Sequence, residues 1–523
     1  MDSATVISNS SVQGIIEATG LYAGGMIGYM DSSYVSTSHA TDSVKSAGNY
    51  VGGLVGFSTN STTTKSYASN SVTGGSSVGG LIGHSDTTSV VNKSYASGSV
   101  HGTDQVGGLV GYQLGASTIE NSYSTGDLTG NNYLGGLVGR SVSSSSITNS
   151  YSIAAISGNG IKGGLVGSNE SSTISSSYWD SLSTGATYGL GADDNAQTAA
   201  VLTIPEMMSA TSFTGWDFSS DTVWAIIEGG SFPYLENVGT QITTAAAFDG
   251  SGGWRTVGQA GDVTYDDLLG HIWTQGFEGS DGGTGASSNV YFFDENSYSW
   301  KIPSDSSNYF GTNSASPSDS LRGALIWFYP DDDADGNDDA FPKYLVANTN
   351  IRNMDSTFNV PLSYTSSFSS DSSGWNLVSN PYPYSLNWRD VVDAADNKNT
   401  LPVAYIWDHS LNSNNGGYKI NYGYPLPPGA PEDFFFDGHI PVMQSFWVKA
   451  SGTGASLTFK PEYQEAAKSP YKQNSGKEKE KGQISDFISI KVEHDEFSDR
   501  VLLFPDNGEG INADIPKLNT LAG

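Results

Sequence analysis

The residues best suited to bind an ion form one acidic segment in the second half of the chain. Aspartates occupy positions 1, 3, 5 and 9 of the run that begins at Asp331, with a glycine at position 6. This spacing matches the first part of a calcium loop, whose ligands are carboxylate, amide and carbonyl oxygens. Position 12 is Pro342 instead of a glutamate, and no flanking helices are predicted. Calcium binding and a solvated acidic hairpin tip both remain open, and the candidate ligands are Asp331, Asp333, Asp335, Asn337 and Asp339.

Residue patterns typical of catalytic sites are missing from the sequence. The seven histidines are scattered, and none forms the His-Glu-x-x-His pair of zinc peptidases. There is no cysteine, which excludes disulfides, thiolate zinc sites and cysteine nucleophiles. Residues 1–182 contain only ten acidic and five basic side chains, too few for the clustered carboxylates of sugar-cleaving enzymes. We therefore expect a chain that is not an enzyme and has no cofactor other than the calcium considered above.

Aromatic residues offer a second kind of candidate site. Tyr382, Tyr384 and Trp388 lie in and just after a proline-containing segment, where their rings could stack on a glycan. Aromatic rings also fill cores, so packing around a proline-rich turn is the alternative interpretation.

A repeat of about 28 residues fills the first third of the chain. The segment Gly-Gly-(Leu/Met)-(Val/Ile)-Gly occurs six times, in steps of 27 or 28 residues, and a Ser-Tyr pair keeps step with it. A fixed period of this length is typical of solenoids, and the short β-type runs between Gly, Asn and Ser favour one parallel β-helix coil per repeat. We expect the tyrosine to form a structural ladder and one leucine per coil to form a core column, made of Leu54, Leu81, Leu109, Leu137 and Leu165.

These motifs resemble the GLUG repeats, named for Gly-Leu-any-Gly, of bacterial surface adhesins and of some immunoglobulin A-cleaving proteases. The resemblance covers about residues 1–182 and implies a surface-exposed, right-handed parallel β-helix. Protease members owe their activity to a separate metal-binding module. The resemblance therefore implies no chemistry for the repeat itself.

Residues 183–238 break the period and are predicted to cap the solenoid. Thr203 to Glu206 has the signature of a helix start with a capping box and a proline in the first turn. Since a solenoid needs a terminal unit that covers its last coil, we expect aromatic side chains of this segment to plug the core: Trp216, Phe218 and Trp224.

The rest of the chain contains an internal duplication. Three motifs recur in the same order, and the tryptophans that bound each copy are 73 residues apart in the first (Trp254, Trp327) and 72 in the second (Trp375, Trp447). We predict two related β-sandwich units, 239–365 and 366–467. A charged linker, 468–482, and the start of a further β unit, 483–523, would follow.

Parts of the second copy resemble the C-terminal modules of surface proteins exported by the type IX secretion route of Bacteroidetes-like bacteria. The motifs that carry this resemblance are 374–384 and 440–449, and it covers about residues 240–523. It implies an extracellular location on the bacterial outer surface, with attachment to the cell through regions absent from this chain.

The net charge of −31 argues against binding to nucleic acid or to an anionic membrane, and no apolar run is long enough for a transmembrane segment. We expect a non-catalytic, adhesin-like surface protein that binds extracellular glycans or proteins. The alternative is the ancillary part of a secreted protease or polysaccharide-degrading enzyme whose catalytic domain lies outside this chain.

Overall fold

A computed structural model describes residues 5–503, apart from 195–196, 219–222, 240, 260, 317–320, 332–337, 339–340, 351–355, 370–371, 394–395, 410, 412–415, 422, 424–435, 466–487 and 495–496. The chain divides into two compact units, Met1–Thr243 and Thr244–Gly523. The predicted linker 468–482 lies outside the described residues.

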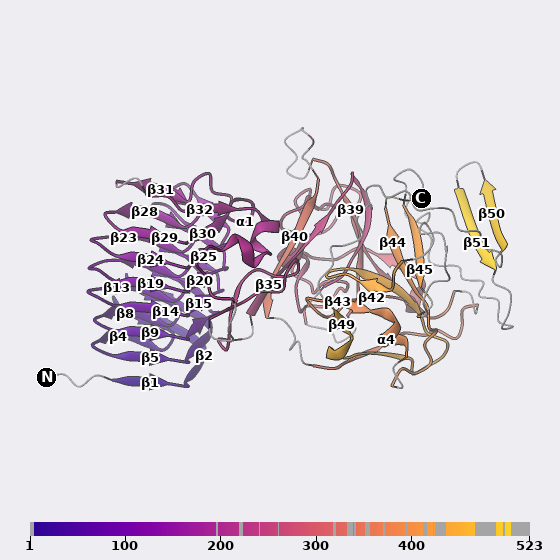
Figure 1. The fold of residues 1–523 in the computed structure, drawn as a ribbon, viewed down its shortest axis with the longest axis horizontal. Coiled ribbons are helices and arrows are strands. Elements are labelled where there is room, and N and C mark those ends of the chain that lie inside the picture. The colour runs from indigo at the N-terminus through magenta and orange to yellow at the C-terminus, as the bar shows by residue number, and fades with distance from the viewer. Residues whose placement is uncertain are drawn as a thin grey trace. The chain divides into compact units, whose positions relative to one another are not determined.

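Unit 1 is a parallel β-solenoid whose coils stack in sequence order (Figure 1). Its first sheet, sheet A, takes one strand from each of seven coils: β1 (Val6–Ser8), β5 (Tyr34–Ser36), β9 (Thr62–Thr64), β14 (Val90–Asn92), β19 (Thr118–Glu120), β24 (Ser146–Thr148) and β29 (Thr173–Ser175). Its second sheet, sheet B, runs in the order β26 (Ile156–Gly158), β21 (Leu128–Gly130), β16 (Val100–His101), β11 (Ser71–Thr73), β6 (His39–Ser46), β10 (Tyr67–Ala68), β15 (Tyr95–Ala96), β20 (Tyr123–Ser124), β25 (Tyr151–Ser152), β30 (Tyr178–Asp180) and β32 (Ala200–Leu202), with β2 (Ser11–Ala18) beside β6.

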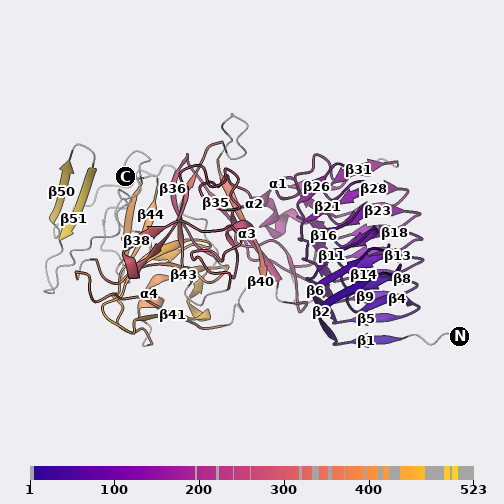
Figure 2. The same ribbon diagram turned by 180° about the vertical axis from the view of Figure 1, so that it is seen from behind.

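Two further sheets complete each coil, and the strands of sheet D are seen stacked in order in Figure 2. Sheet C consists of β27 (Lys162–Gly163), β22 (Leu134–Gly135), β17 (Asp104–Gly107), β12 (Ser76–Gly79), β7 (Val51–Gly52) and β3 (Ala23–Gly24). Sheet D consists of β31 (Leu190–Asp193), β28 (Val166–Glu170), β23 (Val138–Val142), β18 (Val110–Gln113), β13 (Ile82–Asp86), β8 (Val55–Thr59) and β4 (Ile27–Asp31).

The predicted leucine column is confirmed. The backbone N–H of Leu54 donates to the carbonyl of Leu81, the next leucine donates to Leu109, and the series continues to Leu165 at 2.8–2.9 Å. All five side chains are fully buried in one core cluster. Leu54 lies at the bend between β7 and β8, so it and its neighbour Val55 both turn inward. This bend explains how two adjacent apolar residues are buried in one coil.

The Ser-Tyr pair builds two ladders on sheet B. Each buried serine accepts a hydrogen bond through its Oγ from the backbone N–H of the serine one coil earlier, as Ser94 does from Ser66 at 3.2 Å. The tyrosines stack in register, with ring centroids 4.9 Å apart between Tyr95 and Tyr123. The tyrosine ladder is therefore structural, as predicted, and the serine before it joins successive coils.

Trp179 fills the core at the last coils, a role that was predicted for Trp216, Phe218 and Trp224. In sheet B it stands opposite Ser152, at a position that alanine or serine holds in the four preceding coils. It is 4% exposed and belongs to the core cluster. The short helix α1 (Ser181–Thr184), capped by the side chain of Asp180, follows directly.

The predicted plug was wrong in its placement, because Trp216 and Trp224 contact the tyrosine ladder and not the core. Trp224 lies 6.0 Å from Tyr123 and from Tyr151, measured between ring centroids. The hydroxyl of Tyr151 donates to the carbonyl of Pro233 at 2.6 Å. The segment after α1 thus covers the outer face of sheet B. It contains α2 (Ile204–Met207), η1 (Ala210–Ser212), β33 (Trp224–Ala225) and β34 (Tyr234–Leu235), and α2 begins at the predicted capping box.

Unit 2 contains the duplication, because two four-stranded antiparallel sheets have the same strand order. The first runs β36 (Gly253–Val257), β39 (Ala324–Phe328), β37 (Val290–Asp294), β38 (Ser299–Lys301), and the second runs β42 (Trp375–Ser379), β47 (Ser445–Lys449), β44 (Ala404–Asp408), β45 (Gly417–Asn421). Each copy adds a two-stranded sheet, β35 (Gln241–Phe248) with β40 (Lys343–Asn350) and β41 (Phe358–Pro361) with β48 (Ser456–Phe459). The helices α3 (Tyr265–Leu269) and α4 (Trp388–Val392) take equivalent places.

The remaining elements of unit 2 are short. They are η2 (Glu295–Ser297), η3 (Pro461–Tyr463), a sheet of β46 (His439–Ile440), β43 (Ser385–Asn387) and β49 (Gln464–Glu465), and the hairpin β50 (Ile488–His494) with β51 (Phe497–Leu503). The hairpin lies within the predicted further β unit.

The two copies contact one another reciprocally. Val257 of the first copy forms a β-bridge with Gln444, which precedes β47, and Val378 of the second forms one with Arg322, which precedes β39. Both valines end the same Gly-Trp-x-x-Val motif. The copies therefore form a pseudo-symmetric pair.

Candidate ligand-binding face

The outer side of sheet D carries aromatic residues at one position in successive coils. Tyr29, Phe57, His84, Tyr112 and Arg140 stand opposite one another in register along β4, β8, β13, β18 and β23. A second column, just before the strands of sheet C or within them, contains Tyr22, Tyr50, Ser77, Gln105 and Tyr133. We call these two columns the aromatic face.

The rings of the two columns pack against one another as well as along each column. Tyr29 and Phe57 are nearly parallel, with centroids 5.4 Å apart, and Tyr22 stacks on Tyr50 at 5.5 Å with an angle of 18° between the rings. Across the columns, Tyr50 meets Phe57 edge to face at 5.5 Å. Tyr29 is 51% exposed and Tyr22 43%, so the packed rings still present apolar surface to solvent. An exposed apolar patch bordered by polar residues is typical of a binding site.

Glycine makes this arrangement possible. A Cβ placed on Gly56 would lie 2.8 Å from the carbonyl oxygen of Tyr50, and one on Gly83 would lie 2.5 Å from the backbone nitrogen of Val51. The last glycine of each Gly-Gly-Leu-Val-Gly segment therefore lets sheets C and D approach closely. Because of this approach, Tyr50 and Phe57 lie side by side although seven positions separate them in sequence.

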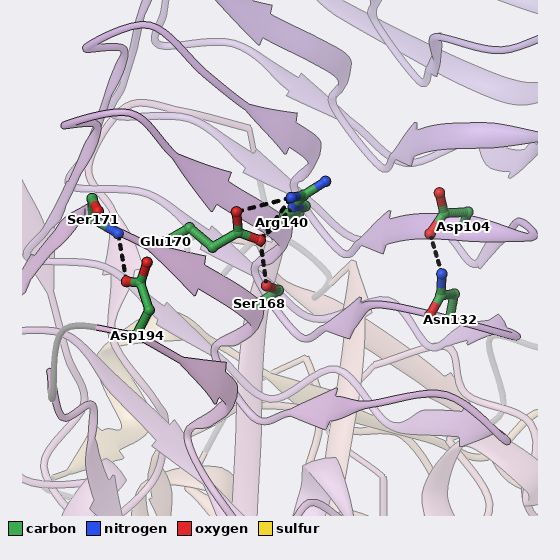
Figure 3. A network of polar contacts seen from close by, with 7 residues as sticks. All are labelled: Asp104, Asn132, Arg140, Ser168, Glu170, Ser171 and Asp194. Atoms are coloured by element: carbon green, nitrogen blue, oxygen red, sulfur yellow. Dashed lines mark hydrogen bonds and ion pairs between the residues drawn. The ribbon is translucent and has the colours of Figure 1, made fainter.

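Polar residues border the aromatic face on both of its sides. Before the aromatic positions come Asn49, whose Oδ1 accepts from the N–H of Ser76, and Asn132, whose amide donates to Asp104 at 2.9 Å (Figure 3). After them comes a row in which Asn60 donates to Asp31 at 3.4 Å. An apolar centre with a polar rim is the ordinary anatomy of a recognition surface.

Arg140 ends the first column and is paired with an acid. Its Nε and Nη2 donate to the two carboxylate oxygens of Glu170 at 2.8 and 2.9 Å, and Ser168 donates to the same carboxylate (Figure 3). The guanidinium also lies 5.7 Å from the ring of Tyr112 and 5.5 Å from that of Tyr133. Its charge is thereby balanced within the face.

His84 is the buried member of the first column. It is 5% exposed and stacks on Phe57 at 4.6 Å. Burial lowers its pKa to about 4, and the charge of Asp86 opposes the shift only in part. The ring is therefore neutral at pH 7 and behaves as another aromatic member of the face.

The glycan contact predicted at Tyr382, Tyr384 and Trp388 does not fit the structure. Tyr382 and Trp388 are fully buried in the core of the second copy, and the hydroxyl of Tyr382 donates to the carbonyl of Ser356 at 2.7 Å. Only Tyr384 is partly exposed. The alternative interpretation, packing around the proline-rich turn, is correct for the two buried rings.

Four of the five proposed calcium ligands lie outside the described residues: Asp333, Asp335, Asn337 and Asp339. Asp331 is described and is partly buried. Among the described residues, no group of three or more His, Asp or Glu side chains is placed to hold a metal ion. The calcium site stays a prediction.

Unit 2 has a small cavity between its two copies, lined by Arg255, Trp407, Asp408 and His409 among others. Arg255 donates to the backbone carbonyls of Asp249 and Ser251, and Lys419 lies 2.7 Å from Asp408. These buried charges are used in contacts within the protein. The cavity therefore contributes to the packing of the two copies and offers little room for a ligand.

The aromatic face was not predicted from the sequence, although the sequence contains a signal for it. The face uses two residues of each repeat. One directly follows the Gly-Gly-Leu-Val-Gly segment, and the other lies two positions before the first glycine of that segment. These positions hold Tyr, Phe or His in several coils but Ser, Gln or Arg in others. A search for identical residues in each repeat passes over such a column.

Comparison with known proteins supports the resemblance of the repeat to the GLUG motif. A model of the GLUG motif matches residues 47–73 and 102–129. No curated protein and no solved structure matches the chain significantly. No helix among the described residues is long and apolar enough to cross a membrane. Each matched segment carries a core leucine and members of the aromatic face, so two of the coils that form this face match the GLUG motif.

Proposed function

We propose that this chain is a non-catalytic, adhesin-like part of a protein displayed outside a bacterial cell, where it attaches the cell to extracellular glycans or proteins. The observation that carries the proposal is the aromatic face. It exposes Tyr22 and Tyr29 on a rigid solenoid and is bordered by amide and carboxylate groups. Such a surface is suited to recognition.

The solenoid also supports a role in attachment through its regularity. The coils are spaced at about 4.8 Å, so similar contacts recur along the stack and many weak contacts add up to firm retention. The resemblance of 240–523 to modules of type IX-exported proteins supports a place on the outer surface of the cell, with anchoring through regions outside this chain.

A second candidate function uses the same face. In the binding part of a larger secreted protease or polysaccharide-degrading enzyme, the aromatic face would hold the substrate near a catalytic domain located elsewhere in the protein. The sequence of the regions adjoining this chain in the full-length protein distinguishes the two functions, since a catalytic module would be recognisable there.

The test is to incubate the purified chain with immobilised polysaccharides and extracellular matrix proteins and to measure retention and turnover together. Matrix without ligand serves as the control. We expect retention on at least one ligand and no turnover. Turnover that a point substitution within this chain abolishes would contradict a non-catalytic role, and absence of retention on every ligand would contradict attachment.

A further inference from the structure

We propose that the ligand of the aromatic face is an uncharged polysaccharide that lies along the stack of coils, across β4, β8, β13, β18 and β23. This inference rests on the proposed function and names the class of ligand. It follows from the charge of the face, from its repeat and from the chemistry of its side chains.

The charge of the face selects against polyanions. The cation in the first column, Arg140, is bound by both oxygens of Glu170. His84 is buried, and no ring nitrogen of it has a hydrogen-bond partner among the described residues. The rims carry Asp31 and Asp104. A sulfated or uronic-acid polymer would be repelled by these carboxylates and would find no unpaired cation in the two columns. An uncharged polysaccharide is not repelled.

The repeat of the face fits a polymer. From Tyr29 to Arg140 the first column crosses five coils in register, which at a strand spacing of about 4.8 Å gives a strip about 19 Å long. The strip is two side chains wide. A linear chain of sugar units can follow such a narrow strip from coil to coil, while a folded partner protein needs a broader apolar centre.

The side chains of the face match the two kinds of surface that a sugar offers. The C–H face of a pyranose packs on aromatic rings, here the half-exposed Tyr22 and Tyr29 and the partly buried Tyr50 and Phe57. Sugar hydroxyls both donate and accept, and the rims supply acceptors and donors through Asn60, Asp104 and Asn132. Asn60 lies in the same coil as Tyr50 and Phe57, so both kinds of contact are available at that level of the stack, and Asp104 and Asn132 border the face further along it.

Affinity electrophoresis of the full chain tests the inference. The gels contain a neutral soluble polysaccharide (mixed-linkage β-glucan, xyloglucan, galactomannan or soluble starch) or a polyanion (alginate or heparin), at low and at high salt. The variant carries Tyr22→Ala and Tyr29→Ala together, and because both residues are more than 40% exposed, we expect it to keep the fold. The matched control carries Tyr34→Ala and Tyr188→Ala, which are exposed elsewhere on the solenoid unit, at 40% and 67%.

We expect at least one neutral polysaccharide to retard the native chain equally at both salt concentrations, the face variant to bind about tenfold more weakly or worse, and the control to bind as the native chain does. Retardation by polyanions alone, retardation of the face variant equal to that of the native chain, or no retardation by any neutral polysaccharide would overturn the inference. If matrix proteins still retain the chain in that case, the attachment function stands and only the ligand class is wrong.

Discussion

The rings of Tyr29 and Phe57 lie nearly parallel, with their centroids 5.4 Å apart, at the same position of two successive coils. Neither residue belongs to the core, and their contact exists because the coils beneath them are in register. The exposed face is therefore only as regular as the solenoid that carries it. Substitutions inside the solenoid should disturb the face, whereas substitutions on the face should leave the solenoid intact.

Gly83→Ala should disrupt the corner between sheets C and D. The new Cβ would lie 2.5 Å from the backbone nitrogen of Val51, an atom that has little freedom to move. We expect a loss of about 1–3 kcal/mol in the free energy of unfolding, measured by urea denaturation. Gly20→Ala is the matched control, because its Cβ would meet nothing within 4 Å. Equal stability of the two variants would contradict the close approach.

Leu109→Ala should open a cavity in the leucine column. Leu109 is fully buried between Leu81 and Leu137, so we expect the substitution to lower the free energy of unfolding by about 2–5 kcal/mol. Leu182→Ala makes the same change at a residue that is 52% exposed, and should stay within about 0.5 kcal/mol of the native chain. A cost at Leu109 as small as that at Leu182 would show that the column is not packed.

His84→Phe should make the solenoid less sensitive to acid. The pKa of His84 is lowered from 6.5 to about 4 by burial, so between these values the unfolded chain binds a proton that the folded chain does not. Stability is thus present at neutral pH and is lost as pH falls from 6.5 towards 4, by roughly 2–3 kcal/mol. Urea unfolding at pH 7 and pH 5 should show a smaller difference for the variant than for the native chain.

The control for this prediction is His101→Phe, which removes an exposed histidine. This variant should keep the native dependence on pH. The account of His84 fails if both variants lose the same amount of stability between the two pH values.

The tyrosine ladder should make unfolding at alkaline pH cooperative. Burial raises the pKa values of Tyr95, Tyr123 and Tyr151 well above the usual value near 10. Above about pH 10 the unfolded chain loses protons that the folded chain keeps, so stability falls as pH rises. Ultraviolet titration of tyrosinate should therefore show a step that coincides with loss of the β-sheet circular dichroism signal.

Tyr123→Phe removes one of these buried groups and should shift that step to higher pH, while Tyr34→Phe, at a position 40% exposed, should not. Titration of all tyrosines without loss of the fold would contradict burial of the ladder beneath the segment that contains Trp216 and Trp224.

Much of the fold could be predicted because the repeat and the duplication each impose a spacing. The steps of 27 or 28 residues fix the register of the coils, and the spacing of Trp254 to Trp327 matches that of Trp375 to Trp447 in a sheet with the same strand order. The pairing itself is less regular. Trp254 pairs with Trp327, whereas Trp375 pairs with Lys449, two residues beyond Trp447. A shift of two residues preserves which face each side chain occupies.

The remaining errors have a common physical origin, since apolar content does not reveal which surface a residue covers. Trp216 and Trp224 were assigned to the open end of the core, but the outer face of the tyrosine ladder is apolar as well. Trp179, which does fill the core, follows a Ser-Tyr pair like those of the other coils. Tyr382 and Trp388 are of residue types that often line sugar-binding sites, but both side chains are fully buried in a core.

The most direct measurement of the central claim is oxidative footprinting of individual tyrosines in the full chain, with and without the ligand that retains it. We predict that Tyr22 and Tyr29 become protected from hydroxyl radicals, while Tyr34 and Tyr188, exposed elsewhere on the solenoid unit, react as before. Protection of Tyr34 or Tyr188 with Tyr22 and Tyr29 unchanged would contradict the claim that the aromatic face binds the ligand.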